Sequence, residues 1–171
     1  MTNLVRPHGS RELKPLIVED KAKSEAIIRS SLDTKRLELN SSASANVVML
    51  GAGYFTPLSG FMDKENALNV ARKMQTTEGI FWPIPIMNLS TSEATEFIEG
   101  EELLLLDPNY PDKRPIAIQT VNSVETLTSE ELEIIAENVF GTKDSNHPGV
   151  KNFMHQGSTL IAGPIKVFNY S

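Results

Sequence analysis

The chain has 171 residues, of which 40% are hydrophobic and 22% charged, a composition typical of one soluble globular domain. It contains no cysteine, which excludes disulfides, thiolate metal sites and a cysteine nucleophile and favours a reducing, cytoplasmic location. A net charge of −6 with scattered basic pairs disfavours nucleic-acid binding, and no apolar run is long enough for a signal peptide or a membrane span.

Two helices are predicted in the first fifty residues, after an irregular arm over residues 1–15. Asp20 is placed to cap a helix that reaches about Ser30, because its carboxylate accepts hydrogen bonds from the first free amides. Residues 41–50 predict a short buried helix that ends at Gly51 or Gly53, since glycine readily adopts a left-handed conformation. The apolar face of the first helix is expected to comprise Ala22, Ala26 and Ile27.

A third helix and an extended segment follow. Asp63 is placed to cap a helix whose buried face comprises Ala67, Leu68, Val70, Ala71 and Met74. Residues 51–62 are thus predicted to be a loop between two helices. Over residues 80–89, Pro83 and Pro85 predict an edge strand or extended segment, because proline cannot donate to a sheet.

The second half of the chain predicts strands at residues 103–106, 116–121 and 162–170, with a turn-rich hairpin loop between the first two. Thr128 and Glu131 form a capping box that opens a helix, and Gly141 is placed to end it. Strands mixed with short helices predict an α+β fold, a small barrel-like mixed sheet with several short packed helices.

The glycine-rich stretch from Gly51 to Gly60 has two interpretations. Backbone amides of glycines can approach a phosphate, but the spacing matches neither a dinucleotide-binding turn nor a P-loop. The favoured interpretation is a tight connection between helices, with Phe55, Leu58 and Phe61 in the core.

No two of the three histidines have the close helical spacing that is typical of a zinc site. The sequence His147-Pro148-Gly149-Val150 is typical of a type II turn, and Arg6-Pro7-His8-Gly9 of a type I turn. A zinc site made by His8, His147 and His155 would need three distant segments to converge. Turn or interface roles are therefore favoured for these histidines.

Five short sequences occur in one order along the chain: Pro7-His8-Gly9, GAGYFTPLSGFM at 51–62, EGIFWPIPI at 78–86, DSNHPGV at 144–150 and Gly163-Pro164-Ile165. They resemble the P-H-G, G-x-(F/Y)-(S/T)-P-L-x-G-F-M, D-G-x-x-(W/F)-P-x-P-I, D-x-x-H-P-G-V and G-P-I elements of the ATP sulfurylase (sulfate adenylyltransferase) family. Ser10 and Thr56 stand where many members have glycine and serine, and Thr56 keeps the hydroxyl.

The resemblance implies that residues 1–171 are a single PUA-like N-terminal domain. In this family the chemistry belongs to a following nucleotidyltransferase domain with Q-x-R-N, H-x-G-H and G-R-D motifs, none of which occurs here. Gln119-Thr120-Val121-Asn122 lacks the arginine, and His147-Pro148-Gly149 is followed by valine. We therefore expect a scaffold or docking domain that is inactive alone, with no catalytic, substrate-binding or metal-binding residue and no cofactor.

For the whole enzyme, the resemblance implies that MgATP and sulfate react to give adenylyl sulfate and pyrophosphate, as part of cytoplasmic sulfur metabolism such as sulfate assimilation. The expected partner is the missing catalytic domain, faced by His147, Pro148, Gly149, Val150 and Tyr170. Two alternatives stay open: a free-standing PUA-like module that binds RNA or protein, and a small enzyme with a three-histidine metal site. The physiological direction of the reaction stays open too, and so does assembly of the whole enzyme as a homo-oligomer.

Overall fold

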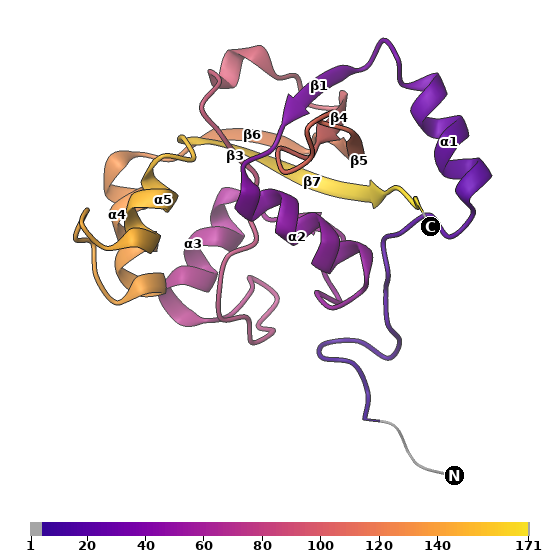
Figure 1. Cartoon of the computed structure of the whole chain (residues 1–171). Coiled ribbons are helices and arrows are strands. Elements are labelled where there is room, and N and C mark those ends of the chain that lie inside the picture. Colours follow the sequence, from indigo (N-terminus) through magenta and orange to yellow (C-terminus); the bar gives the residue numbers. More distant parts are fainter. Residues whose placement is uncertain (1–4, 171) are drawn as a thin grey trace. The chain divides into compact units, whose positions relative to one another are not determined.

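The computed structural model describes residues 5–170, so the prediction for residues 1–4 of the arm lies outside the described part (Figure 1). The chain forms two compact units, each built from separate stretches of sequence. Unit 1 contains the chain up to Gly60, residues 102–120 and the segment from Pro164 onwards. Unit 2 contains residues 61–101 and 121–163.

The sheet of unit 1 is mixed. Strand β1 (Lys35–Glu38) pairs in parallel with β4 (Glu102–Leu106), and β4 pairs antiparallel with β5 (Pro115–Thr120). The last part of β7 (Thr159–Val167) continues the sheet antiparallel to β5. The predicted strands at 103–106 and 116–121 and the hairpin between them are confirmed, and the mixed pairing agrees with the predicted α+β class.

Two helices belong to unit 1, and both begin where the sequence predicts, the first after its predicted cap Asp20. Helix α1 (Lys21–Ser30) follows Asp20, whose carboxylate accepts from the Ala22 and Lys23 amides. Helix α2 (Ser41–Gly51) follows Asn40 and ends with Ala52 as its cap and Gly53 at a φ of 81°. The left-handed glycine after the helix is therefore Gly53.

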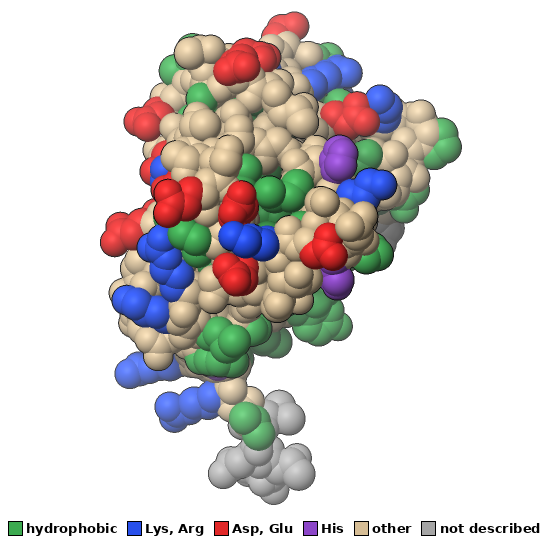
Figure 2. All heavy atoms as spheres, turned by 90° about the vertical axis from the view of Figure 1, so that its left-hand side faces the viewer, with side chains coloured by type: hydrophobic (Ala, Val, Ile, Leu, Met, Phe, Trp, Pro, Cys, Tyr) green, Lys and Arg blue, Asp and Glu red, His purple; other side chains and the backbone are tan. Residues whose placement is uncertain are grey.

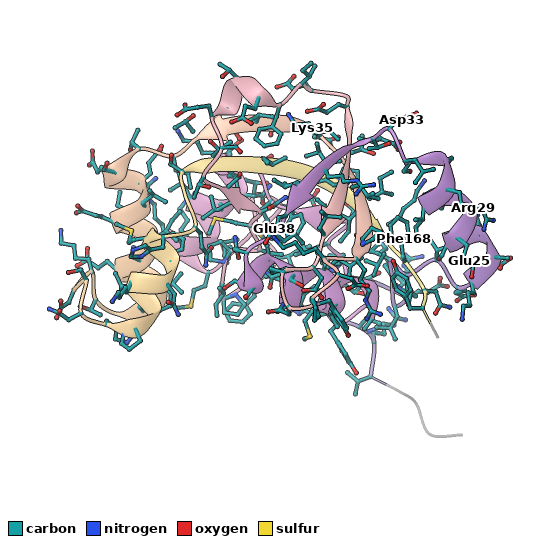
Figure 3. The ribbon with its side chains drawn as sticks, turned by 45° about the horizontal axis from the view of Figure 1, so that its top comes forward. Glu25, Arg29, Asp33, Lys35, Glu38 and Phe168 are labelled. Carbon is teal, nitrogen blue, oxygen red and sulfur yellow. The ribbon has the colours of Figure 1, made fainter. Side chains whose placement is uncertain are left out.

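The expected apolar face of α1 is wrong in part, because Ala22 and Ala26 are exposed. The helix instead packs through Ile27 and Ile28 against a cluster of buried side chains that comprises Leu104, Ile118 and Phe168. Figure 3 shows Phe168 directly after the end of β7. It also shows Glu25 and Arg29 on α1, where the two side chains form an ion pair of 3.6 Å. Asn169 adds a hydrogen bond from its side chain to the Glu19 carbonyl, which fixes the chain after β7 against the start of α1.

The sheet of unit 2 is built around the first part of β7. Strands β3 (Leu89–Ser90) and β6 (Ser123–Thr126) both pair antiparallel with it. The two-residue strand β2 (Gly60–Phe61) lies where the chain leaves unit 1 for unit 2. Before β3, residues 82–88 run without strand pairing, as the prolines predict. A single 3-10 turn, η1 (Ala94–Glu96), follows β3.

Three helices pack on this part of the sheet. Helix α3 (Lys64–Lys73) begins after Asp63, and α4 (Ser129–Phe140) has the predicted capping box and stops at Gly141, whose φ is 72°. The third, α5 (Pro148–Met154), precedes β7. Side chains of these helices form one core with buried residues of the sheet and of the loop before α4: Ala67, Ala71, Leu89, Leu127, Leu132, Ile135, Ala136, Val150, Phe153 and Leu160. Each large apolar side chain buried here contributes roughly 1.5–3 kcal/mol of transfer free energy.

The prediction of a type II turn at His147–Val150 is wrong, since Pro148 is the first residue of α5. Proline is compatible with that position because its missing amide hydrogen is not needed in the first helical turn. The predicted turn near the N-terminus is shifted by one residue, with Ser10 donating to the Pro7 carbonyl and Gly9 at a φ of 62°. The last strand also begins earlier than predicted, at Thr159, and ends at Val167.

Candidate functional site

The loop after α2 is a packed connection in which its hydroxyl group is used internally. Thr56 is buried, donates from Oγ1 to the Gly53 carbonyl at 2.8 Å, and accepts at the same atom from the Lys14 amide at 2.9 Å. A side chain at Gly53 would meet the Pro15 backbone at 3.2 Å. These contacts support a structural connection over a phosphate cradle, and a threonine supplies the required hydroxyl as well as a serine would.

The predicted interface residues at 147–150 lie at the start of α5. His147 is exposed and caps the helix, accepting at Nδ1 from the Val150 amide at 3.4 Å, and its ring lies 5.8 Å from that of Phe140. Gly149 is confined, because a Cβ there would lie 2.8 Å from the Phe140 ring. Val150 is 1% exposed and belongs to the core. Of this group, His147 and Pro148 thus present the exposed surface.

Tyr170, the fifth predicted interface residue, belongs to unit 1. Its hydroxyl donates to the Pro115 carbonyl, and its ring lies 4.8 Å from the Arg114 guanidinium, which also stacks at 3.6 Å on Tyr110. Burial raises the pKa of the Tyr170 hydroxyl, against the opposing effect of the nearby Arg114 charge. The two tyrosines and the arginine form a cation–π stack, which sequence reasoning missed because Tyr170 is 56 residues from Arg114 along the chain.

The structure gives His147 and His155 separate local roles. His155 donates from Nδ1 to the Lys151 carbonyl at 2.6 Å, within α5 and its cap. Within residues 5–170, no group of three or more histidine, aspartate or glutamate side chains is arranged to hold a metal ion. Gln119, the glutamine of the incomplete Q-x-R-N sequence, is fully buried in β5.

Basic side chains are dispersed and several are paired with carboxylates. Ion pairs join Lys64 to Glu131 at 2.8 Å, Lys113 to Glu38 at 2.7 Å and Lys143 to Glu133 at 3.2 Å. Near the centre of the face shown in Figure 2, acidic side chains surround basic ones. This charge distribution disfavours a polyanion such as RNA as ligand, because such binding depends on clustered cations.

An open groove of about 620 Å³ lies in unit 1, lined by residues 15–20, Lys23, Ser59 and residues 164–166. Its charged side chains include Lys23 and Lys166 but also Glu19 and Asp20. Asp20 is already committed to capping α1. Because two lysines and two carboxylates line the groove, its charges do not favour binding of an anion.

Residues 5–170 match the family model for the PUA-like domain. The chain belongs to the PUA-like domain family. Its expected fold class is thereby confirmed, from the family match as well as from the mixed sheet and short helices of the structure.

This PUA-like chain is similar along its length to proteins named sulfate adenylyltransferase. It is 43% identical over 171 residues to that of Alcanivorax borkumensis, covering 100% of this chain and 42% of the relative. It is 38% identical over 169 residues to that of Allochromatium vinosum, covering 98% of this chain and 42% of the relative. The chain therefore spans less than half the length of these curated relatives.

The chain is also similar to a solved structure. The hexameric APS kinase from Thiobacillus denitrificans superimposes with a TM-score of 0.66 and 26% sequence identity, covering 96% of this chain and 27% of that chain. In the part of the chain that the structure describes, no helix combines the length and apolar character needed to cross a membrane.

Proposed function

We propose that this chain is the N-terminal domain of a sulfate adenylyltransferase and acts as a scaffold and docking domain for the part that carries the chemistry. The observation that carries the proposal is the match of the entire chain to 42% of the Alcanivorax enzyme. The ordered motifs from Pro7 to Ile165 support the same assignment.

In the reaction proposed for the whole enzyme, a sulfate oxygen attacks the α-phosphorus of MgATP. The bond to the β-phosphate breaks, which releases pyrophosphate and leaves adenylyl sulfate. Such a transition state needs convergent cationic and amide donors. The basic side chains of this chain are dispersed, and Lys64, Lys113 and Lys143 are paired with carboxylates, which supports placing those donors, and the Mg²⁺, outside it.

We place the whole enzyme in cytoplasmic sulfur metabolism, with ATP and sulfate, or adenylyl sulfate and pyrophosphate, as its substrates. The hexameric state named for the solved relative supports a homo-oligomeric whole enzyme. For the docking of the catalytic part, the residues proposed from the sequence remain His147, Pro148, Gly149, Val150 and Tyr170. His147 and Pro148 are exposed, which suits a contact with the catalytic part. Val150 is buried and anchors α5 in the core.

A domain exchange tests this function directly. In the Alcanivorax enzyme, the matched 42% is replaced by this chain, and pyrophosphate release from MgATP and sulfate is measured for the chimera and for this chain alone. We expect activity in the chimera and, for the chain alone, a rate at least roughly a thousandfold lower, because it lacks the groups that stabilise the transition state. A folded but inactive chimera contradicts the assignment, and turnover by the chain alone contradicts the division of labour.

A further inference from the structure

Helix α2 is unusual for a helix on the surface of a charged protein. Its sequence, SSASANVVMLG, contains no charged residue over eleven positions. Surface helices normally carry an apolar stripe on one side and charged residues on the other. A helix without charge on any side is typical of an element covered on both sides.

One side of α2 is covered within unit 1. Ala43, Ser44, Val47, Leu50 and Gly51 are all buried. Contact at Gly51 is close, since a Cβ there would lie 3.0 Å from Val167 Cγ1. The amide of Leu16 also donates to the Gly51 carbonyl at 3.1 Å, which ties the N-terminal segment to the end of the helix. The inner face of α2 is therefore buried within unit 1.

The opposite side of α2 is apolar and open. Ala45, Val48, Met49 and Ala52 are exposed and follow the i, i+3, i+4, i+7 spacing of a single helical face. Val48 is 61% exposed, and Tyr54, just after the helix, is 74% exposed. We call these five residues the α2 face. Isolated exposed apolar residues need no explanation, but a periodic row of them marks an interaction surface.

The Tyr110–Arg114–Tyr170 stack lies next to the start of the same helix. Ser41 Oγ, in the first turn of α2, donates to Asn109 Oδ1 at 3.2 Å, and Asn109 precedes Tyr110. Tyr110 and Tyr170 are 42% and 41% exposed. Tyrosine, arginine and methionine are the residue types enriched at protein–protein interfaces, so the composition here fits an apolar protein partner with a polar rim.

We propose that the α2 face docks the remainder of the longer sulfate adenylyltransferase polypeptide, an inference that rests on the proposed function. More than half of the length of the matched relatives lies outside the region that this chain matches. We take that remaining part of the polypeptide as the partner that covers the α2 face. Five side chains are fewer than the roughly 20–30 residues, about 800 Å² per partner, that a stable interface between free molecules uses. Covalent linkage removes that requirement, because a tethered partner is present at millimolar effective concentration.

Single-cysteine variants provide a clean test, because the chain has no cysteine of its own. Val48→Cys reports on the α2 face, and Leu32→Cys is the matched control, an apolar residue of the same unit with 64% exposure outside α2. Modification by N-ethylmaleimide is followed by peptide mass spectrometry in this chain alone and in the exchange chimera. Chimeras with the Alcanivorax and with the Allochromatium enzymes give two independent backgrounds.

We expect both cysteines to react at similar rates in the chain alone. In the chimera, the rate of modification of Val48→Cys should fall by at least about tenfold, whereas that of Leu32→Cys should stay within about twofold of its rate in the chain alone. Equal reactivity of Val48→Cys in both contexts overturns the proposal. If modification of Val48→Cys in the chain alone slows as the protein concentration rises, a second copy of the chain covers the α2 face, and the proposal is overturned.

Activity separates this inference from the proposed function. An active chimera with an unprotected Val48→Cys contradicts the docking face alone. A folded, protected but inactive chimera contradicts the assignment as a sulfate adenylyltransferase domain while the docking face stands. As a second variant, Val48→Glu should lower chimera activity, and Leu32→Glu should not. Because glutamate is a good helix former at an exposed position, Val48→Glu should leave the chain alone folded.

Discussion

Lys64 connects two helices of unit 2 through one side chain. Its ammonium donates to the Thr126 carbonyl at 3.1 Å and pairs with Glu131 at 2.8 Å, and Glu131 also closes the capping box of α4. Burial by itself raises the pKa of Glu131, but the Lys64 ammonium and the Thr128 amide outweigh it, so the pKa lies below its ordinary value. The ionised form of Glu131 is therefore favoured by the fold.

A carboxylate with a lowered folded-state pKa stabilises the protein above its unfolded pKa, and this stability is lost as pH falls through the folded pKa. We expect Glu131→Gln to reduce the free energy of unfolding at pH 7 by about 0.5–1 kcal/mol, the usual range for such a pair. At pH 3 the difference should be smaller than at pH 7, because the contribution of the ionised carboxylate is lost as pH falls through its lowered folded-state pKa. Urea unfolding at the two pH values measures this.

The same substitution on the same helix provides the control. Glu133 pairs with Lys143, but both side chains are about half exposed, at 49% and 58%. Solvent screens such a pair, so Glu133→Gln should leave the unfolding midpoint unchanged. A pH-independent loss at Glu131, equal at pH 7 and pH 3, would show that the charge of Glu131 is not what stabilises the junction.

Helix α5 has seven residues, and a helix this short is not stable by itself. It is held by Val150 and Phe153 in the core and by its cap at His147. We expect His147→Ala to lower the free energy of unfolding by about 0.5–1 kcal/mol and His147→Asn to restore it, because asparagine is a good N-cap. Urea denaturation of the chain alone measures both.

The asparagine variant also separates capping from docking. If His147 belongs to the proposed interface, His147→Asn in the chimera should lower the rate of pyrophosphate release although the fold is as stable as before. An unchanged rate with His147→Asn, and a reduced one with His147→Ala only, would assign His147 a capping role and remove it from the interface.

Elements differ in how far the sequence predicts them. The starts of α1 to α4 follow from local signals at Asp20, Asn40, Asp63 and Thr128, since a cap and the amides it serves are adjacent in sequence. Strand β1 has one buried side chain, Leu37, among charged neighbours, and it forms by parallel pairing with a strand more than sixty residues away. Such a strand cannot be predicted from the local sequence pattern.

At the scale of the whole molecule, the chain passes between the two units four times, after residues 60, 101, 120 and 163. Strand β7 is continuous through the last of these positions, with its first part in the sheet of unit 2 and its last part in that of unit 1. A strand shared in this way favours cooperative unfolding, because fraying in one sheet removes the partner strand from the other.

The intrinsic chromophores report on the units separately. The single tryptophan, Trp82, lies in unit 2, whereas Tyr54, Tyr110 and Tyr170 lie in unit 1. We expect urea transitions followed by tryptophan fluorescence and by tyrosine near-ultraviolet signals to coincide within about 0.2 M, as a two-state transition requires. Two separated midpoints would instead show that the units unfold independently.

The sequence by itself determined the caps of α1, α3 and α4, the α+β class and the family motifs, because each depends on residues that are neighbours along the chain. The tertiary structure decided the rest. It buried Gln119 completely, stacked Arg114 on the distant Tyr170 as well as on Tyr110, and turned one side of an uncharged helix outward. Strand pairing and exposure depend on contacts between segments far apart in sequence, which local patterns do not encode.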